Sequence, residues 1–338
     1  MGDSRFGTER TTLADMHPRL SGLLEEVEAT LSREDSEGAG FIDLATERAL
    51  SGPAKRLRPS VLLLAAECAG GATESAVALA GVVELVHAAS LVHDDVIDEA
   101  LSRRGRSSAN ALWGNKISVL LGDYILARAL AAIPGGSRER FLPELARVAA
   151  EMCIGQLSEL RATGRLLAEP AYMEIVQAKT ARLFAFCGWA GAVSSGASPR
   201  LADALARFGQ RFGVAYQFAD DILDVVGTDG RSGKPEGKDL AERKSTLPLI
   251  LAASIGGDEV AAQVSALLGK DVLSPGDGET LRLLVESVGA AEAAWEKVRD
   301  WLGEARAELV EVPECAAKDA LLAVCADLFP MPVMAVDR

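Results

Sequence analysis

Aromatic side chains are scarce in this chain, and so is any alternation of polar and apolar residues. Aromatic residues make up 5% of the 338 residues, although 49% are hydrophobic. Alanine and leucine supply much of the apolar content and favour helix, whereas aromatic and β-branched residues favour strands. Because no stretch alternates for long enough to indicate a strand, we expect an all-α fold.

A surplus of positive charge is missing as well. The chain has 35 Lys and Arg against 49 Asp and Glu, a net charge of −14. Proteins that bind nucleic acid need a basic surface, so we expect no nucleic-acid partner. The positive charge gathers in two islands, Lys55-Arg56-Leu57-Arg58 and Arg103-Arg104-Gly105-Arg106. Such islands are typical of a site for a small phosphorylated ligand, or else of solvated surface arginines.

The sequence also lacks a cysteine pattern, an export signal and a long uninterrupted apolar run. The five cysteines are odd in number and have no metal-site spacing, which favours reduced, buried thiols in a cytoplasmic protein. The first residues are polar and contain no signal-peptide core. The most apolar stretch, 77–93, is interrupted by Glu84, His87 and Ser90, so we expect a core helix and no transmembrane segment.

Helical patterns separated by turn signals cover most of the chain. We expect a disordered tail over 1–15 and one domain over 16–338, a single large bundle of about twelve helices. The expected helices are 17–32, 41–51, 59–69, 74–98, 115–132, 139–162, 170–192, 199–226, 244–255, 258–268, 278–288, 290–310 and 315–327.

One short acidic motif occurs twice, 126 residues apart (94 to 220), as Asp94-Asp95-Val96-Ile97-Asp98 and Asp220-Asp221-Ile222-Leu223-Asp224. In a helix, the first and last aspartates of each motif share a face. Buried carboxylates at that spacing repel one another, and hard cations remove the repulsion. A single copy is weak evidence, because acidic residues often cap helices. Two copies after apolar helices predict facing carboxylate patches that hold a Mg²⁺-diphosphate.

The segment 227–239 follows the second motif and contains four glycines and one proline. It carries Lys234 and Lys238. Loops that close over a charged site have this composition, and so do plain surface loops. Its position beside the motif favours the first interpretation.

Seven segments together resemble the trans-prenyltransferases, the polyprenyl diphosphate synthase family. They run in the family's order from about residue 52 to 250. The matching segments are Lys55-Arg56-Leu57-Arg58-Pro59, His87 to Asp98, Arg103-Arg104-Gly105, Gly114-Asn115-Lys116 with Leu121-Gly122-Asp123-Tyr124, Lys179-Thr180-Ala181, Gln217 to Asp224, and Gly233-Lys234-Pro235 with Thr246-Leu247-Pro248.

The resemblance implies the isoprenoid synthase fold, a bundle around a central apolar cavity, usually as a homodimer. It implies that an allylic diphosphate condenses with isopentenyl diphosphate, with three Mg²⁺ ions bridging the motifs. By position, Asp94, Asp98 and Asp220 resemble the metal ligands. Asp95, Asp221 and Asp224 resemble supporting groups.

The resemblance also assigns the cations. Arg103, Lys179, Lys234 and Lys244 resemble the groups that hold the allylic diphosphate. Lys55, Arg58, His87 and Arg104 resemble the isopentenyl diphosphate site, and Thr180 and Gln217 resemble polar groups near the reacting carbon. One departure is Arg243, which stands before Lys244 where the family commonly has glycine.

Three other classes are disfavoured by particular residues. A terpene cyclase would usually replace the second acidic motif and would not need Lys55, Arg58, His87 and Arg104. A non-catalytic subunit of a heteromeric synthase typically loses acidic residues, and this chain keeps all six. A di-iron bundle would need Glu-x-x-His pairs, which are not placed for it.

Product length depends on the side chains one turn before the first motif, Ala89 and Ser90. Short-product members of the family commonly carry an aromatic residue there. Because helical side chains lean toward the N-terminus, two small residues leave the tunnel open and predict a product longer than farnesyl diphosphate. The resemblance implies a medium-to-long chain of about 30 to 50 carbon atoms. Geranylgeranyl or farnesyl diphosphate is the alternative. Leu142, Leu145 and Met152 are candidates for a deeper floor.

Overall fold

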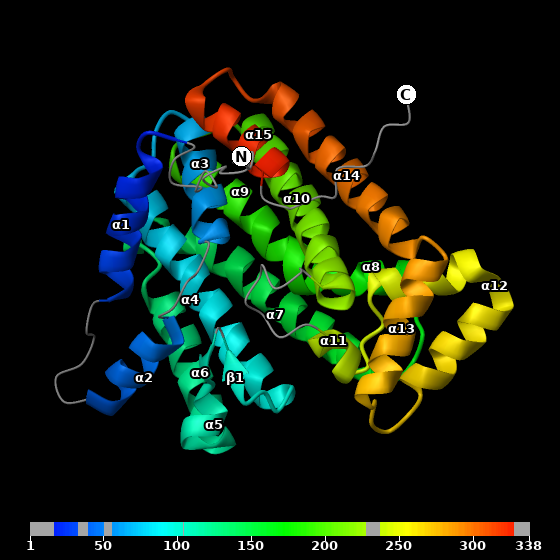
Figure 1. Ribbon diagram of the computed structural model, residues 1–338. Helices are drawn as coiled ribbons and strands as arrows, with labels where there is room; N and C mark the ends of the chain where they lie inside the picture. Colours follow the sequence, from blue (N-terminus) through cyan, green and yellow to red (C-terminus); the bar gives the residue numbers. More distant parts are fainter. Residues whose placement is uncertain (1–16, 33–39, 51–55, 104, 228–236, 328–338) are drawn as a thin grey trace, which may run out of the picture.

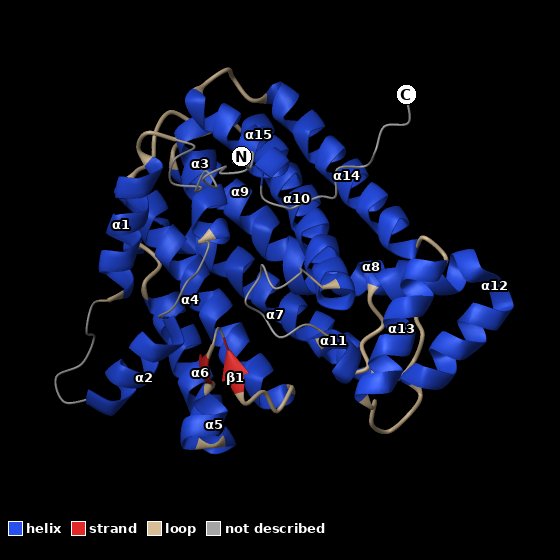
Figure 2. Cartoon of the chain, in the orientation of Figure 1, coloured by secondary structure: helices blue, strands red, loops and turns tan. Residues whose placement is uncertain are grey.

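A computed structural model describes residues 17–32, 40–50, 56–103, 105–227 and 237–327. These residues form helices almost throughout, so the predicted all-α fold is confirmed (Figures 1 and 2). Within the described ranges the strands are β1 (Ser102–Arg103) and β2 (Arg106–Ser107), which pair antiparallel. Two-residue strands are too short to produce an alternating sequence pattern, so they were not predicted.

Four long helices form the centre of the bundle: α3 (Leu57–Cys68), α4 (Glu74–Ile97), α9 (Arg182–Ser194) and α10 (Pro199–Val226). Helix α9 packs between α3 and α10, α14 (Ala290–Glu308) covers the other side of α10, and α6 (Asn115–Ala131) packs on α4 (Figure 1). Two glycines of α9 permit the close approach. A Cβ at Gly188 would lie 2.0 Å from the Leu205 carbonyl oxygen, and one at Gly191 would lie 2.0 Å from that of Leu62.

The stretch predicted as one helix over 170–192 is divided. Helix α8 (Glu169–Val176) runs into a π turn, η3 (Gln177–Ala181), before α9 begins. Hydrophobic periodicity does not report one widened turn inside a continuous helix. Such turns occur frequently at functional sites, and this one contains Lys179 and Thr180.

Other boundaries agree with the prediction to within a few residues. Helix α12 (Leu247–Leu268) is broken at Gly257, where φ is 71°, in agreement with the two predicted helices 244–255 and 258–268. The short helices α5 (Ala109–Trp113) and α11 (Lys238–Ala241) were missed. The remaining elements are α1 (Leu20–Leu31), α2 (Gly40–Leu50), η2 (Gly135–Ser137), α7 (Arg138–Ala162), α13 (Pro275–Ser287), η4 (Leu309–Glu311) and α15 (Ala316–Asp327).

Helices α4 and α12 are long and apolar enough to cross a membrane by length and composition alone. The most apolar window of α4 is 72% buried, because α4 packs against α3, α6 and α9. Packing in the protein core therefore accounts for the apolar residues of α4. The corresponding window of α12 is 44% buried. The absence of a transmembrane segment stays a prediction. So does the tail over 1–15, which lies outside the described residues.

Candidate active site

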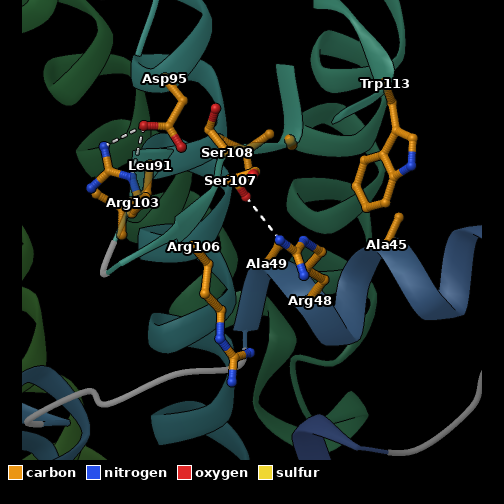
Figure 3. A pocket seen from close by; sticks show the side chains of 12 residues that line it. Ala45, Arg48, Ala49, Leu91, Asp95, Arg103, Arg106, Ser107, Ser108 and Trp113 are labelled. Carbon is orange, nitrogen blue, oxygen red and sulfur yellow. Dashed lines mark hydrogen bonds and ion pairs between the residues drawn. The ribbon is translucent and has the colours of Figure 1, made fainter. Parts of the chain in front are cut away.

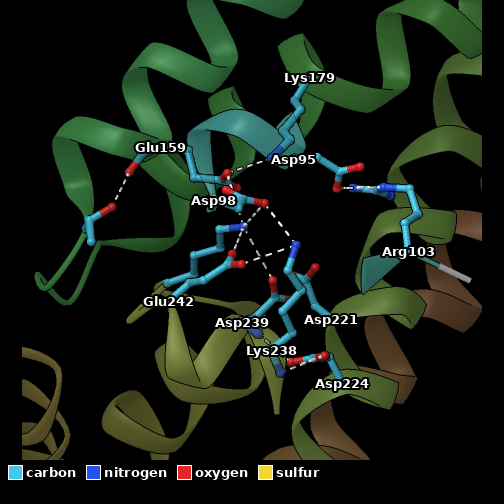
Figure 4. Close-up of polar contacts among 12 residues, drawn as sticks. Asp95, Asp98, Arg103, Glu159, Lys179, Asp221, Asp224, Lys238, Asp239 and Glu242 are labelled. Carbon is cyan, nitrogen blue, oxygen red and sulfur yellow. Dashed lines mark hydrogen bonds and ion pairs between the residues drawn. The ribbon is translucent and has the colours of Figure 1, made fainter. Parts of the chain in front are cut away.

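The two acidic motifs lie at the C-terminal ends of α4 and α10, and Lys238 of α11 contacts both. The Lys238 Nζ donates to Asp98 Oδ2 over 2.9 Å, and its backbone N–H donates to Asp224 Oδ1 over 3.2 Å. The next N–H, of Asp239, donates to Asp224 Oδ2 over 2.8 Å. Figure 4 shows these carboxylates and lysines converging. The motifs therefore border one common space, as their spacing predicts.

Burial places a high cost on the negative charge of this space. It raises the pKa of Asp94, and the neighbouring Asp98 and Glu159 carboxylates add to the increase, against an opposing effect of Lys179. Burial, followed by repulsion from Asp239, raises the pKa of Asp224 to about 7. Asp94 and Asp224 therefore hold protons more tightly than free aspartates do, as expected where buried carboxylates lie close together.

Two predicted cations lie among the carboxylates. Lys179 Nζ donates to Glu159 Oε2 over 2.6 Å. Lys244 Nζ lies 2.5 Å from Glu242, 3.6 Å from Asp239 and 3.9 Å from Asp98. Burial opposes the charge of Lys244, but the surrounding carboxylates raise its pKa above the ordinary value. Lys244 therefore remains charged beside the motifs, and both lysines lie where a diphosphate would need them.

A hydrogen-bonded chain connects the π turn to the second motif. The Thr180 hydroxyl donates to Gln217 Oε1 over 2.7 Å, and Gln217 Nε2 donates to Asp221 Oδ1 over 2.8 Å. The Tyr172 hydroxyl of α8 donates to the other oxygen of Asp221 over 2.5 Å. Burial raises the pKa of Asp221 well above its usual range, with a further contribution from Asp239. The predicted pair, Thr180 and Gln217, is thus brought together on the second motif.

Asp95 points to the other side of α4, toward the β1–β2 hairpin. Arg103 Nε donates to Asp95 Oδ1 over 2.8 Å, so a supporting aspartate and a predicted diphosphate-binding arginine contact each other. They border a cavity of about 60 Å³ whose wall includes Arg106 and Trp113 (Figure 3). A volume of this size accommodates ordered water.

The predicted isopentenyl diphosphate site is described in part. Arg58 Nη1 lies 3.1 Å from His87 Nε2, and the Arg58 guanidinium carbon lies 4.8 Å from the centre of the Phe184 ring. Arg58 and His87 are therefore brought together as predicted. The other predicted cations, Lys55, Arg104 and Lys234, lie outside the described residues.

The residues fit a divalent cation that takes part of its ligands from a substrate. Within the described ranges, no three His, Cys, Asp or Glu side chains are arranged to hold a metal ion by themselves. Magnesium commonly uses one or two carboxylates together with substrate phosphates. The lysine ammonium groups bound to Asp98 and Glu159 mark carboxylate oxygens where a cation is favourable.

Several contributors were not predicted. Glu159, Tyr172, Asp239 and Glu242 line the site or support it, but nothing in their spacing separates them from ordinary helical surface residues. Asp239 has a weak signal, since it adjoins Lys238 in the glycine-rich segment. Arg243 is left-handed, with φ at 57°. That conformation favours glycine, which gives a physical reason for glycine being common there in the family.

The comparisons with known proteins identify the family and the fold. A sequence model described as "Polyprenyl synthetase" matches residues 41–281, well over half of the chain. The chain belongs to the polyprenyl synthetase family. It is a prenyltransferase with the all-α isoprenoid synthase fold.

Two curated relatives and one solved structure illustrate the similarity. The chain is 37% identical to the nonaprenyl diphosphate synthase of Mycobacterium tuberculosis, over 80% of this chain and 81% of the relative. It is 33% identical to a short chain isoprenyl diphosphate synthase of Methanothermobacter thermautotrophicus, over 82% and 86%. The crystal structure of a polyprenyl synthase from Caulobacter crescentus complexed with calcium and isoprenyl diphosphate has a TM-score of 0.87, 33% identity, and coverage of 94% and 97%.

Proposed function

We propose that this prenyltransferase condenses an allylic diphosphate with isopentenyl diphosphate, in the presence of Mg²⁺, to give a longer trans-polyprenyl diphosphate. The observation that carries the proposal is the convergence of both acidic motifs on Lys238, with Lys244 beside Asp98, because it combines carboxylates for metal with ammonium groups for phosphate. The Caulobacter protein, crystallised with calcium and isoprenyl diphosphate, supports a divalent cation beside a diphosphate in this fold.

Each group has a role that follows from its charge. Asp94, Asp98 and Asp220 would hold Mg²⁺, which would supply positive charge to offset the charge of a departing diphosphate. Lys179 and Lys244 bind the same diphosphate as monovalent cations. Three Mg²⁺ ions in the site are the expectation carried by the resemblance.

Isopentenyl diphosphate must keep its diphosphate, so its site uses cations without metal. Arg58, Lys55 and Arg104 supply them, and His87 contacts Arg58. The allylic carbon becomes electron-poor as its diphosphate departs. The apolar residues around it offer no nucleophile, so the double bond of isopentenyl diphosphate is the group that attacks it. The released diphosphate accepts the proton lost from the product, so no protein base is required.

The product is of medium-to-long chain, about 30 to 50 carbon atoms, because small side chains one turn below the metals leave room for growth. Ala89 is buried in α4, and the Ser90 hydroxyl donates to the His87 carbonyl oxygen over 2.8 Å, within its own helix. The nonaprenyl relative supports a long product and the short chain relative supports the alternative, geranylgeranyl or farnesyl diphosphate. Leu145 is fully buried and Leu142 and Met152 are partly buried, and all three stay candidates for a deeper floor.

The test is to incubate purified protein with Mg²⁺, labelled isopentenyl diphosphate and separate allylic primers, and to size the extracted products. Elongation dependent on both substrates and on the metal is the expected result. Products no longer than 20 carbons would favour the alternative length, and no elongation with any primer would contradict the proposal.

The enzyme acts as a homodimer, and a second copy covers an apolar face on α6 and α7. Ile117 and Leu120 of α6 and Ile154 and Leu157 of α7 are exposed by 37%, 68%, 60% and 59%. We infer that a second copy covers these side chains, because large exposed apolar surfaces mark protein interfaces. Sedimentation of Leu120→Asp and Leu157→Asp should give monomers, whereas Leu283→Asp on exposed α13 should remain dimeric.

A cytoplasmic location, expected from the sequence, is part of the proposal, and fractionation of cells tests it.

A further inference from the structure

Arg56, the residue before α3, has an unusual backbone conformation. Its φ of 46° and ψ of 36° lie in the left-handed region, which long side chains rarely adopt. Its carbonyl oxygen accepts the Ser60 N–H over 2.9 Å and the Ser60 hydroxyl over 2.8 Å, which closes the first turn of α3. A residue held in this region needs surroundings that fix it.

The Arg56 guanidinium supplies that fixation through two glutamates and one carbonyl. Its Nε donates to Glu28 Oε1 of α1 over 2.5 Å, its Nη2 donates to the Leu50 carbonyl oxygen over 3.3 Å, and its Nη1 donates to Glu84 Oε1 of α4. Glu84 is 5% exposed in the middle of a core helix, whereas the Glu28 side chain is 48% exposed. A carboxylate buried as deeply as Glu84 requires a charged partner.

A second contact, made by Arg58, joins α3 to α4. Glu84 and His87 are three residues apart on α4 and share one face. Glu84 binds Arg56, and His87 lies 3.1 Å from Arg58, so the arginine before α3 and the arginine in its first turn contact two neighbouring side chains of α4. A shift of the Arg56 turn therefore displaces the helical turn that carries Arg58.

We propose that Arg56 is a positioning residue, which together with Glu84 fixes the start of α3 so that Arg58 meets the diphosphate of isopentenyl diphosphate. Most of the Arg56 donors are directed at protein oxygens, so its charge serves the fold of the site and not the substrate. The inference rests on the proposed function, because it assigns a structural support to that function's metal-free phosphate site.

The test compares Glu84→Gln with Glu28→Gln, which remove a buried and a half-exposed partner of the same guanidinium. Glu84→Gln should raise the KM for isopentenyl diphosphate about tenfold, the scale expected for a lost hydrogen bond between charged groups. The KM for the allylic primer and kcat should change less than about twofold, because the acidic motifs are untouched. Glu28→Gln should stay within about twofold in all three, since solvent screens that pair.

Arg56→Lys is the second variant, in case Glu84→Gln does not fold. It leaves a positive charge for Glu84 but removes the fork that also reaches Glu28 and Leu50, and it should also raise the KM for isopentenyl diphosphate selectively. If wild-type protein elongates a primer yet both variants keep the wild-type KM, or raise both KM values equally, the positioning role is wrong and the proposed function stands. If the wild type elongates no primer, the proposed function fails and this inference falls with it.

Discussion

The hydroxyl of Tyr172 lies 2.5 Å from Asp221 Oδ2, which joins α8 to the second acidic motif through a fully buried hydrogen bond. Asp221 also accepts from Gln217, so the carboxyl group is held from both sides. The contact explains how a supporting aspartate keeps its orientation.

Tyr172→Phe should therefore lower the free energy of unfolding by about 1–3 kcal/mol, the cost of leaving a buried polar group without one partner. Urea denaturation measures it. The double variant Tyr172→Phe with Asp221→Asn should lose less than the sum of the single changes, because the two groups act on one hydrogen bond. Strict additivity would show that the bond contributes nothing.

Asp94→Asn should reduce kcat by roughly a hundredfold or more, as expected when a charge-stabilising group is lost. Stability should not fall, because burial and the neighbouring Asp98 already disfavour a charged Asp94. Asp220→Asn should behave similarly in kcat. The matched control is Asp300→Asn on the exposed face of α14, which should be neutral in both assays. Near-normal turnover in Asp94→Asn would remove its assignment as a metal ligand.

The two diphosphates should respond to different cations. Arg58→Ala, Lys55→Ala and Arg104→Ala should raise the KM for isopentenyl diphosphate more than the KM for the primer. Lys179→Ala should do the reverse, because Lys179 lies beside Glu159 at the acidic motifs. Steady-state kinetics with each substrate varied in turn gives the comparison. Equal effects on both substrates from all four variants would show that the division into two sites is wrong.

Chain length should respond to bulk on α4. Ala89→Tyr and Ser90→Phe each place a ring about one turn below the metals, and both should shorten the product without abolishing turnover. Thin-layer separation of dephosphorylated products reports the length. Wild-type products from both variants would show that the growing chain does not pass these residues.

Stability in the presence of a chelator should depend on pH through Asp224. Its pKa of about 7 in the folded protein exceeds the ordinary value. Between the two values the folded state retains a proton that the unfolded chain has released, so the stabilisation is present at low pH and lost as the pH rises through 7. The Tm of Asp224→Asn minus the Tm of the wild type should thus be a few degrees larger at pH 8 than at pH 5. The same Tm difference at both pH values would contradict the shifted pKa.

The sequence predicted the helical fold and the acidic motifs because both depend on short-range spacing. A spacing of four positions between the first and last aspartates puts them on one helical face, whatever packs around that helix. Tyr172 and Glu159 were not predictable, because each meets the site through tertiary packing of α8 and α7. Arg103 shows the limit within a correct prediction. Its proximity to the first motif was evident, but its contact with Asp95 depends on a hairpin too short to leave a pattern.

The π turn at Gln177–Ala181 sets the rotational phase of the helices on either side of it. An α-helix rotates by about 100° per residue, so in an unbroken helix Tyr172 and Phe184, twelve positions apart, would diverge by about 120°. Both nevertheless face α10, Tyr172 stacking on Phe218 and Phe184 meeting Phe212 edge to face. The wider turn rotates less per residue and recovers much of that divergence. Deleting one residue there would restore α-helical phase and turn either the aromatic core or the Asp221 contact away from α10.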